Sequence, residues 1–359
     1  MKTHLWLLFL KMTLKILLGD LMKTIKKDKI AKLLDFLADK YELFAPTSKD
    51  GLVVSFERIK EGKQAKLRFY NSNEAPKKLF FPQSETLFSY SKGGRETVPE
   101  PKTEQQRIIF GLKPCDTKSL SLSDKVFDTT DFKDPYHTQK RGNTIIFTLA
   151  CNRPQSSCFC TALGLGPFLK EGADVFVVDL DDKYLFEPIT QRGEDLLKEI
   201  PGLEEAAEKD ISYAKELAGG VEDKITTKIQ LDSLKEKLDK IFDESVWDEI
   251  HQKCLGCGVC TYLCPTCHCF EIVDEQVNDK GKRIRIWDSC MYPAFTLEAS
   301  GHNPKPTGKE RMHQRIMHKF NYFVENYDEI ACVGCGRCLR NCPACMDITK
   351  VIEQINNLK

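Results

Sequence analysis

Neither sign of charge is in excess in this 359-residue chain, which has 53 Lys+Arg and 53 Asp+Glu. A balanced chain offers no basic footprint for nucleic acid, so we expect no nucleic-acid partner. Long apolar runs are also missing. The run from Leu5 to Leu10 is soon interrupted by Lys11 and Lys15, which makes it too short to span a bilayer, and we expect no membrane association.

The first residues lack the end of an export signal. A signal peptide needs a small-residue cleavage site after its apolar core, and none follows here. Met22-Lys-Thr repeats the opening Met1-Lys-Thr shortly before a conventional helix pattern begins. We therefore interpret residues 1–21 as an extension outside the fold of a cytoplasmic protein. A membrane-surface helix and an export signal are the alternatives.

Nucleotide-binding loops are absent as well. The sequence contains no G-x-G-x-x-G after a strand and no G-x-x-x-x-G-K followed by Ser or Thr. The short stretch Gly164-Leu-Gly166-Pro167 is typical of a turn only. We therefore predict no FAD or NAD site in this chain.

Cysteine, by contrast, is abundant. Sixteen cysteines in a long chain with 30% charged residues are not typical of a secreted disulfide scaffold and indicate metal clusters in a reducing cytosol. Ten of them lie in two runs with the shared pattern C-x-x-C-x-x-C-x-x-x-C-P-x-C, an internal repeat. The first run contains Cys254, Cys257, Cys260, Cys264 and Cys267, and the second contains Cys332, Cys335, Cys338, Cys342 and Cys345.

This spacing is typical of bacterial two-cluster ferredoxins that bind 4Fe–4S clusters. Three thiolates two residues apart can surround one face of a cluster, while the glycines between them allow tight turns that aim N–H groups at sulfur. The cysteine before the proline reaches the other cluster. Zinc also binds C-x-x-C pairs, but its four-ligand sites rarely contain a third cysteine at the same spacing followed by C-x-x-x-C-P. We assign one cluster to Cys254, Cys257, Cys260 and Cys342, and the other to Cys332, Cys335, Cys338 and Cys264.

Four further cysteines are Cys115, Cys151, Cys158 and Cys160. Cys115 follows the predicted strand 107–112, and Cys151 follows the predicted strand 144–150. Because the ends of neighbouring strands converge at one edge of a sheet, these thiols could hold a third 4Fe–4S cluster. Cysteine is also among the most buried residue types, so four structural thiols are the alternative, and the sequence leaves both open.

The other cysteines and histidines carry less information. Cys267 and Cys345 occupy matching places in the repeat, where they can pack beside the clusters and tune their potentials. Cys269 and Cys290 have no assigned role; an additional cluster or a thiol pair is the alternative. His268 and His302 are isolated histidines, which we interpret as ordinary surface or core residues; a role as ligand or proton carrier is the alternative. The literal C-x-x-C-H match that ends at His268 uses Cys264, so we do not interpret it as a heme site.

The pattern of apolar residues predicts an α+β fold: an N-terminal α/β domain, a helical connector and an α-helical two-cluster ferredoxin domain. The predicted domains are 22–190 with Cys115, Cys151, Cys158 and Cys160, then 191–245, then 246–359. Helices are expected at 28–41, 117–126 and 309–327. Strands are expected at 52–59, 66–70, 107–112, 144–150, 174–180 and 183–188, with an apolar loop at 80–88 and a surface hairpin or loop at 93–101.

Several stretches carry a resemblance to a known family. They are Lys113-Pro-Cys115-Asp116, Cys158-Phe-Cys160, Cys264-Pro-Thr-Cys267-His-Cys269-Phe270, Trp287-Asp-Ser-Cys290 and His318-Lys-Phe320. From about Met22 onward the chain resembles beta subunits of sulfhydrogenases and related NiFe hydrogenases, and the A subunit of anaerobic sulfite reductase. The resemblance implies an electron-transfer subunit whose partners are a diaphorase-like flavin subunit and a catalytic subunit.

We therefore expect a non-catalytic iron–sulfur subunit of an anaerobic oxidoreductase, which relays single electrons between a flavin- or nicotinamide-type partner and a catalytic subunit. Two alternatives remain. The N-terminal cysteines could hold an open-site cluster in a stand-alone reductase or sulfur-handling enzyme, or the clusters could serve only to stabilise the fold.

Overall fold

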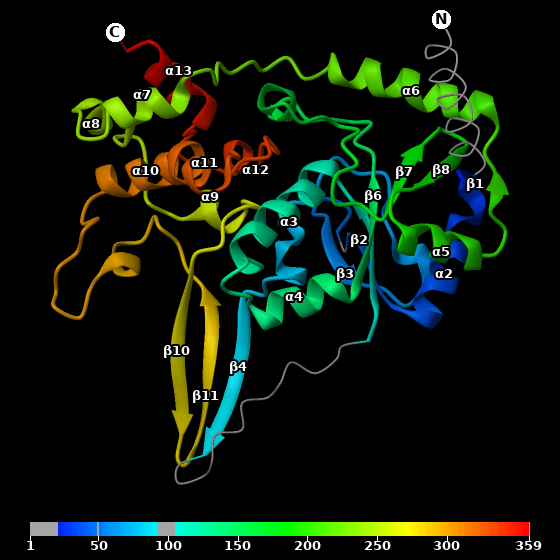
Figure 1. Ribbon diagram of the computed structural model, residues 1–359, viewed down its shortest axis with the longest axis horizontal. Helices are drawn as coiled ribbons and strands as arrows, with labels where there is room; N and C mark the ends of the chain where they lie inside the picture. The colour runs from blue at the N-terminus through cyan, green and yellow to red at the C-terminus, as the bar shows by residue number, and fades with distance from the viewer. Residues whose placement is uncertain (1–20, 49, 92–104, 359) are drawn as a thin grey trace, which may run out of the picture.

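The computed structural model describes residues 21–48, 50–91 and 105–358, so the expectations for residues 1–20 and for the surface loop at 93–101 lie outside the described residues. The fold is mixed α+β (Figure 1). Among the described residues, no helix has the length and apolar character that a membrane crossing requires.

A mixed sheet organises the N-terminal half. Its eight described strands run in the spatial order β3-β2-β5-β6-β7-β8-β1-β9, with β2, β5, β6 and β7 parallel and the remaining pairings antiparallel. The strands are β1 (Lys23–Lys26), β2 (Glu42–Thr47), β3 (Ser55–Arg58), β5 (Arg107–Leu112), β6 (Thr144–Leu149), β7 (Val175–Asp179), β8 (Lys183–Pro188) and β9 (Glu204–Glu205).

Helices cover both faces of this sheet because its central strands are apolar on both sides. Every residue of β5 and β6 is buried, as expected for strands inside a parallel sheet. One face packs on α2 (Ile30–Lys40) and α5 (Gln191–Glu199), and the other packs on α3 (Pro114–Phe127). The helix α4 (Pro135–Gly142) leads into β6, and α6 (Glu208–Glu222) lies along the outer edge.

The C-terminal half is mainly helical. Figure 1 shows its helices gathered at one end of the molecule, away from the outer strands of the large sheet. They are α7 (Leu234–Lys240), α8 (Val246–Ile250), α9 (Val259–Tyr262), α10 (Gly308–Met317), α11 (Phe323–Tyr327), α12 (Arg337–Arg340) and α13 (Ile348–Asn356). A π-helical segment (His318–Tyr322) joins α10 to α11, so the predicted helix 309–327 is confirmed with an internal irregularity.

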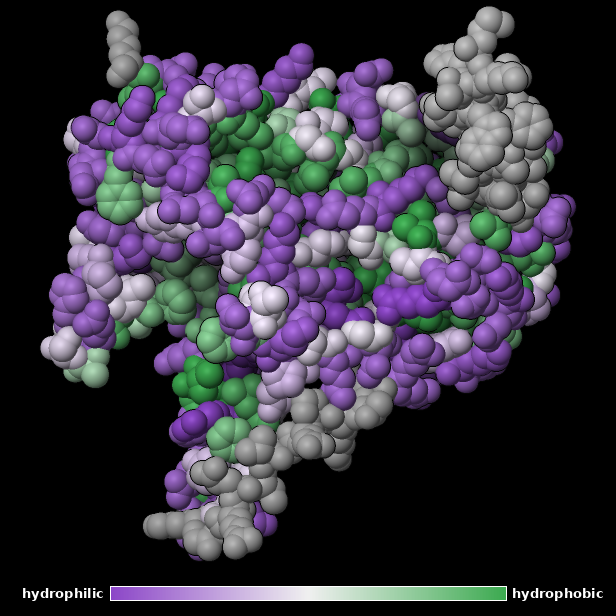
Figure 2. Space-filling view, in the orientation of Figure 1, coloured by the Kyte–Doolittle hydropathy of each residue, from purple (hydrophilic) through white to green (hydrophobic). Residues whose placement is uncertain are grey.

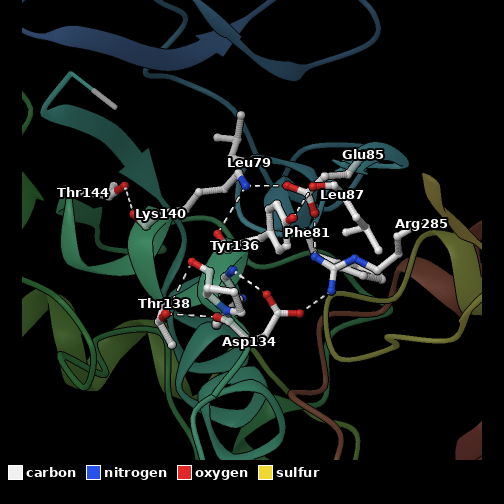
Figure 3. Close-up of polar contacts among 12 residues, drawn as sticks. Leu79, Phe81, Glu85, Leu87, Asp134, Tyr136, Thr138, Lys140, Thr144 and Arg285 are labelled. Atoms are coloured by element: carbon white, nitrogen blue, oxygen red, sulfur yellow. Dashed lines mark hydrogen bonds and ion pairs between the residues drawn. The ribbon is translucent and has the colours of Figure 1, made fainter. Parts of the chain in front are cut away.

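A second sheet connects the two halves. The hairpin β10 (Phe270–Val277) and β11 (Lys280–Trp287) pairs with β4 (Ser84–Ser91) and projects from the body of the molecule (Figure 1). At its base the buried guanidinium of Arg285 donates to Glu85 at 2.5 Å and to Asp134, the N-cap residue of α4 (Figure 3). This ion-paired joint fixes the hairpin against the large sheet.

The structure corrects four expectations. The segment between the two cysteine runs contains the hairpin β10–β11, so this part is not wholly α-helical; its charged, exposed strands hide the alternation that marks a half-buried strand. The predicted loop 80–88 contains most of β4, which forms because the distant β11 pairs with it. Two elements of the predicted connector join the large sheet: α5 packs on its face and β9 pairs with β1. Residues 66–70 form no strand.

The predicted strands 107–112, 144–150, 174–180 and 183–188 and the helices 28–41 and 117–126 are confirmed to within a few residues. The domain boundaries at 22, 191 and 246 stay a prediction. Polar side chains cover most of the face drawn in Figure 2, and apolar residues gather mainly in its upper middle, near the segment that connects α6 to α7.

Candidate iron–sulfur sites

The first site, which we call the first-run site, is a cavity lined by Cys254, Cys257, Cys260 and Cys342. Three of these cysteines come from the first run and one from the second, as the repeat predicted. Most of the remaining wall is apolar and includes Met291, Met312, Met346, Ile348 and Val351. The backbone N–H of Gly256 donates to Cys254 Sγ at 3.4 Å, and that of Met346 donates to Cys342 Sγ at 3.2 Å. The geometry therefore gathers four thiols, dry walls and N–H···S donors.

The second set, the second-run site, comprises Cys332, Cys335, Cys338 and Cys264. The pKa of Cys338 is raised to about 12, mainly by burial and also by negative charge on Cys264, Cys332 and Cys335, while Arg315 opposes the rise. Lys319 donates to Cys264 Sγ at 3.4 Å. Cys264 of the first run lies beside the second run, because Lys319 also donates to Ala331 O, the neighbour of Cys332, at 3.0 Å. That these four thiols bind one cluster stays a prediction.

Arg315 connects these two sets. Its side chain lines the first-run cavity, and its pKa is raised above the ordinary value because Cys260, Cys338, Cys267 and Cys264 outweigh the opposing effect of burial. Its Nε has no hydrogen-bond partner among the described residues. A buried cation with an unpaired donor implies that negative charge belongs beside it.

The third set, the N-terminal cavity, is lined by Cys115, Cys151, Cys158 and Cys160. Cys115 lies in the first turn of α3, Cys151 follows β6, and Cys160 opens a short 3₁₀ turn (Cys160–Leu163). The pKa of Cys160 is raised to about 12, mainly by burial and also by the nearby Cys158 and Cys151. The strand ends have converged as the sequence predicted.

The N-terminal cavity touches the second-run site directly, because Gly334 and Cys335 form part of its wall. The N–H of Phe159 donates to Gly334 O at 2.9 Å. Gly334 has a φ of +61°, and a Cβ there would lie 2.4 Å from the backbone N of Cys160. This glycine is therefore required both for the turn and for the close approach of the two chain segments.

A buried ion pair locks the same contact. Arg337 Nη1 and Nη2 lie 2.7 and 2.9 Å from the carboxylate of Asp116, and both side chains are fully buried. Arg337 also donates to Ser72 O at 2.8 Å. Because Asp116 follows Cys115 and Arg337 lies between Cys335 and Cys338, this pair fixes the N-terminal cavity against the second-run site.

Comparisons with known proteins bear on the two cysteine runs and on the chain as a whole. A family described as "4Fe-4S dicluster domain" matches residues 253–346. The chain is 31% identical over 306 residues to sulfhydrogenase 2 subunit beta of Pyrococcus furiosus, a match that covers 84% of this chain and 88% of the relative. This chain belongs to the family of sulfhydrogenase beta subunits. It is thus an iron–sulfur protein of the 4Fe–4S type, and no solved structure matches it.

In this sulfhydrogenase-family chain the donors fit clusters better than single ions. No group of three or more His, Cys, Asp or Glu side chains in the described parts of the chain is gathered as a single metal ion would require. Instead, two of the three cysteine sets line hollows, and cations lie beside the thiols: Arg315, Lys319 and Lys113. All-thiol donors with N–H···S bonds and nearby cations are typical of 4Fe–4S sites.

Four cysteines remain: Cys269 pairs with Cys290, Cys267 pairs with Cys264 of the second-run set, and Cys345 stands alone. Cys267 hydrogen-bonds Cys264, and the hydrogen bond from Cys290 lowers the pKa of Cys269 to about 7. Cys345 is exposed. Burial lowers the pKa of His268 to about 4, and its ring packs 5.4 Å from that of His318. His302 is exposed, so neither predicted histidine joins a cysteine set.

Sequence reasoning missed the buried cations. Arg315 lies in α10 and Lys319 in the π-helical segment, outside both cysteine runs, so the cysteine spacing indicates neither, although Lys319 belongs to the stretch His318-Lys-Phe320 that carries the resemblance. Lys77 is also buried and donates to Cys267 O at 2.8 Å. Arg337 had a weak signal, because it is the charged residue inside the second run where the first run has Val259.

Proposed function

We propose that this chain is the electron-transfer subunit of a multisubunit oxidoreductase and holds three 4Fe–4S clusters. The ligands would be Cys254, Cys257, Cys260 and Cys342 at the first-run site, Cys332, Cys335, Cys338 and Cys264 at the second-run site, and Cys115, Cys151, Cys158 and Cys160 in the N-terminal cavity. When bound, such a cluster accepts and donates one electron at a time.

The single observation that carries the proposal is the position of Cys335. It belongs to the second-run site and also lines the N-terminal cavity, while Arg315 lies between the second-run and first-run sites. The three sites therefore form a row with the second-run site in the middle. A row of this kind joins the α/β half of the molecule to the ferredoxin-like half.

The side chains around the middle site would tune it. Lys319 is 3% exposed, and its pKa is raised because the thiols Cys264, Cys267 and Cys332 outweigh the opposing effect of burial. Buried cations favour the more negative, reduced state of a neighbouring group, so they raise its reduction potential. The middle site should therefore hold an electron more tightly than the first-run site.

The two ends of the row approach the surface, where partners can dock. At the first-run end Cys257 is exposed and Leu255 is 70% exposed. At the other end Tyr70, which lines the N-terminal cavity, is 54% exposed. We propose a diaphorase-like flavin partner at the α/β half and a catalytic partner of hydrogenase or sulfite reductase type at the ferredoxin-like half, within the cytoplasm.

Iron analysis of the anaerobically purified chain tests this proposal. We expect about twelve irons per chain, four for each site. About eight irons per chain would mean that the N-terminal cavity holds no cluster. A chain that holds only zinc would refute the proposal. Substrate turnover by the isolated chain with an artificial electron donor would favour a stand-alone reductase instead.

A further inference from the structure

A second, polar cavity lies next to the N-terminal cavity. It is at the carboxyl edge of the large sheet, beyond the ends of β5, β6 and β7, where α/β folds usually bind ligands. Its volume is about 310 Å³, at the lower end of the range for small-molecule sites and larger than a single ion needs. None of the cysteine sets lines it.

The cavity wall carries more positive than negative charge. Four cations line it, together with two aspartates. Lys27 pairs with Asp179 at 2.6 Å, and the Tyr213 hydroxyl donates to Asp181 at 2.7 Å, so both carboxylates already have partners. The side chains of Arg68 and Arg153, the two exposed arginines of the wall, make no hydrogen bond or ion pair with any described residue.

Lys113 is the buried member of the four. It is 4% exposed, and its contacts are the face of the Phe69 ring at 4.5 Å and a long hydrogen bond of 3.4 Å to Ala150 O. Within the described residues no carboxylate lies at ion-pair distance from it. It lines both this cavity and the N-terminal cavity, so it is the side chain through which a ligand here would act on the cysteines.

Asn152 contributes a directed acceptor. Its Nδ2 donates to Asp179 O at 2.7 Å, which fixes the orientation of the amide. Its Oδ1 is then buried without a partner among the described residues. A buried acceptor that no residue satisfies is costly and indicates a ligand or water that donates to it.

We propose that this polar cavity binds a phosphate group, either free phosphate or the phosphate of a small hydroxylated metabolite. Arginine forks bind oxyanions through paired N–H bonds, which matches Arg68 and Arg153. An O–H of the protonated phosphate or of the metabolite donates to Asn152 Oδ1. The alternative role of these arginines is to balance the negative charge of the thiolates in the neighbouring cavity. The experiment separates the two roles by changing Arg68, which lines the polar cavity but not the N-terminal cavity.

The test is calorimetric titration of the anaerobically purified full chain with inorganic phosphate, and separately with glycerol 2-phosphate, at constant ionic strength set with potassium chloride. We expect saturable binding of one equivalent of at least one of the two. Binding of glycerol 2-phosphate alone would identify a phosphate ester as the ligand, and binding of both would identify free phosphate as sufficient.

The variant Arg68→Gln should weaken this binding about tenfold or more, because a charge-assisted bond is lost. The matched control is Arg58→Gln, which removes an exposed arginine of β3 that pairs with Glu42 and should leave binding unchanged. Absence of saturable binding of either anion, or equal affinity in wild type and Arg68→Gln, would overturn the inference. Iron content, measured on the same samples, tests the cluster proposal separately, so the two can fail independently.

Discussion

The first-run and second-run sites share one spacing of cysteines but differ in their surroundings. The first-run site opens toward the surface, where Cys257 is exposed, and one buried cation, Arg315, lines it. The second-run site is enclosed: Cys335 and Cys264 are buried, Lys319 lies beside them, and the Arg337–Asp116 pair closes one side. In the proposed row the repeat would set the ligands, while the packing around each copy would decide whether it serves as an exit or as an inner relay.

The crossing of ligands between the two runs gives the largest expected effect. Cys264→Ala should empty the second-run site, with a loss of about four irons, although Cys264 lies in the first run. Cys342→Ala should empty the first-run site instead. Iron content and Mössbauer spectra of both variants measure this, and the opposite pattern of loss would show that each run serves its own site.

The enclosure of the second-run site depends on the buried ion pair. Arg337→Met leaves Asp116 buried without a partner, so we expect a loss of about 3–5 kcal/mol in the free energy of unfolding. The double variant Arg337→Met with Asp116→Leu should recover most of it. Anaerobic urea unfolding provides the measurement.

The control for this change is Arg283→Met, which alters an exposed pair with Asp274 on the hairpin and should cost less than about 1 kcal/mol. Equal destabilisation by Arg337→Met and Arg283→Met would show that the buried pair does not hold the two halves together.

Two buried histidines, His268 and His318, lie near Cys264 and Lys319 on the enclosed side of this comparison. Burial lowers the pKa of His268 to about 4 and that of His318 to about 3, below the ordinary value of 6.5. Both rings therefore bind protons more readily in the unfolded chain, and the free energy of unfolding should fall as the pH drops from about 6.5 toward 4. The expected loss is roughly 2 kcal/mol per histidine at about pH 5.

Urea unfolding at about pH 5 and pH 7.5 measures this loss, and His268→Gln should reduce it. His302→Asn changes an exposed ring and should leave the pH dependence as it is in the wild type. A pH dependence that His268→Gln does not alter would assign the loss to other groups.

Lys319, the cation beside Cys264, should make the reduction potential of the second-run site higher than that of the first-run site. Lys319→Met removes a buried positive charge next to the second-run site, so its reduction potential should fall by about 60 mV, equivalent to a tenfold change in a one-electron equilibrium. Redox titration followed by EPR measures the shift. Lys309→Met, at a surface pair with Asp248, is the control and should shift neither site.

Cys345 should show the smallest effect. It is exposed and belongs to no cysteine set, so Cys345→Ala should retain all the iron of the wild type. Iodoacetamide labelling of the holoprotein should modify this thiol. Loss of about four irons from the variant would show that Cys345 is a ligand, which contradicts the assignment of four other cysteines to each site.

The gathering of Cys254, Cys257, Cys260 and Cys342 around one cavity could be predicted from their spacing, because three closely spaced cysteines share a turn and the cysteine before a proline reaches the other set. Their role as ligands stays a prediction. The N-terminal cavity could be predicted from topology, since strands β5 and β6 are parallel and end at one edge. The contact between Cys335 and that cavity could not be predicted, because it rests on residues far apart in the chain, such as Asp116 and Arg337, which are 221 positions apart. The hairpin β10–β11 was missed because its strands are stabilised by pairing with β4 rather than by burial.

The most direct test of the row of three sites is EPR of the fully reduced, anaerobically purified chain, compared with Cys151→Ser. The wild type should show signals broadened by magnetic coupling among three clusters, and Cys151→Ser should lose the N-terminal signal together with the broadening that it causes at the second-run site. The account would be contradicted if the wild-type spectrum showed only two coupled clusters and the spectrum of Cys151→Ser were the same.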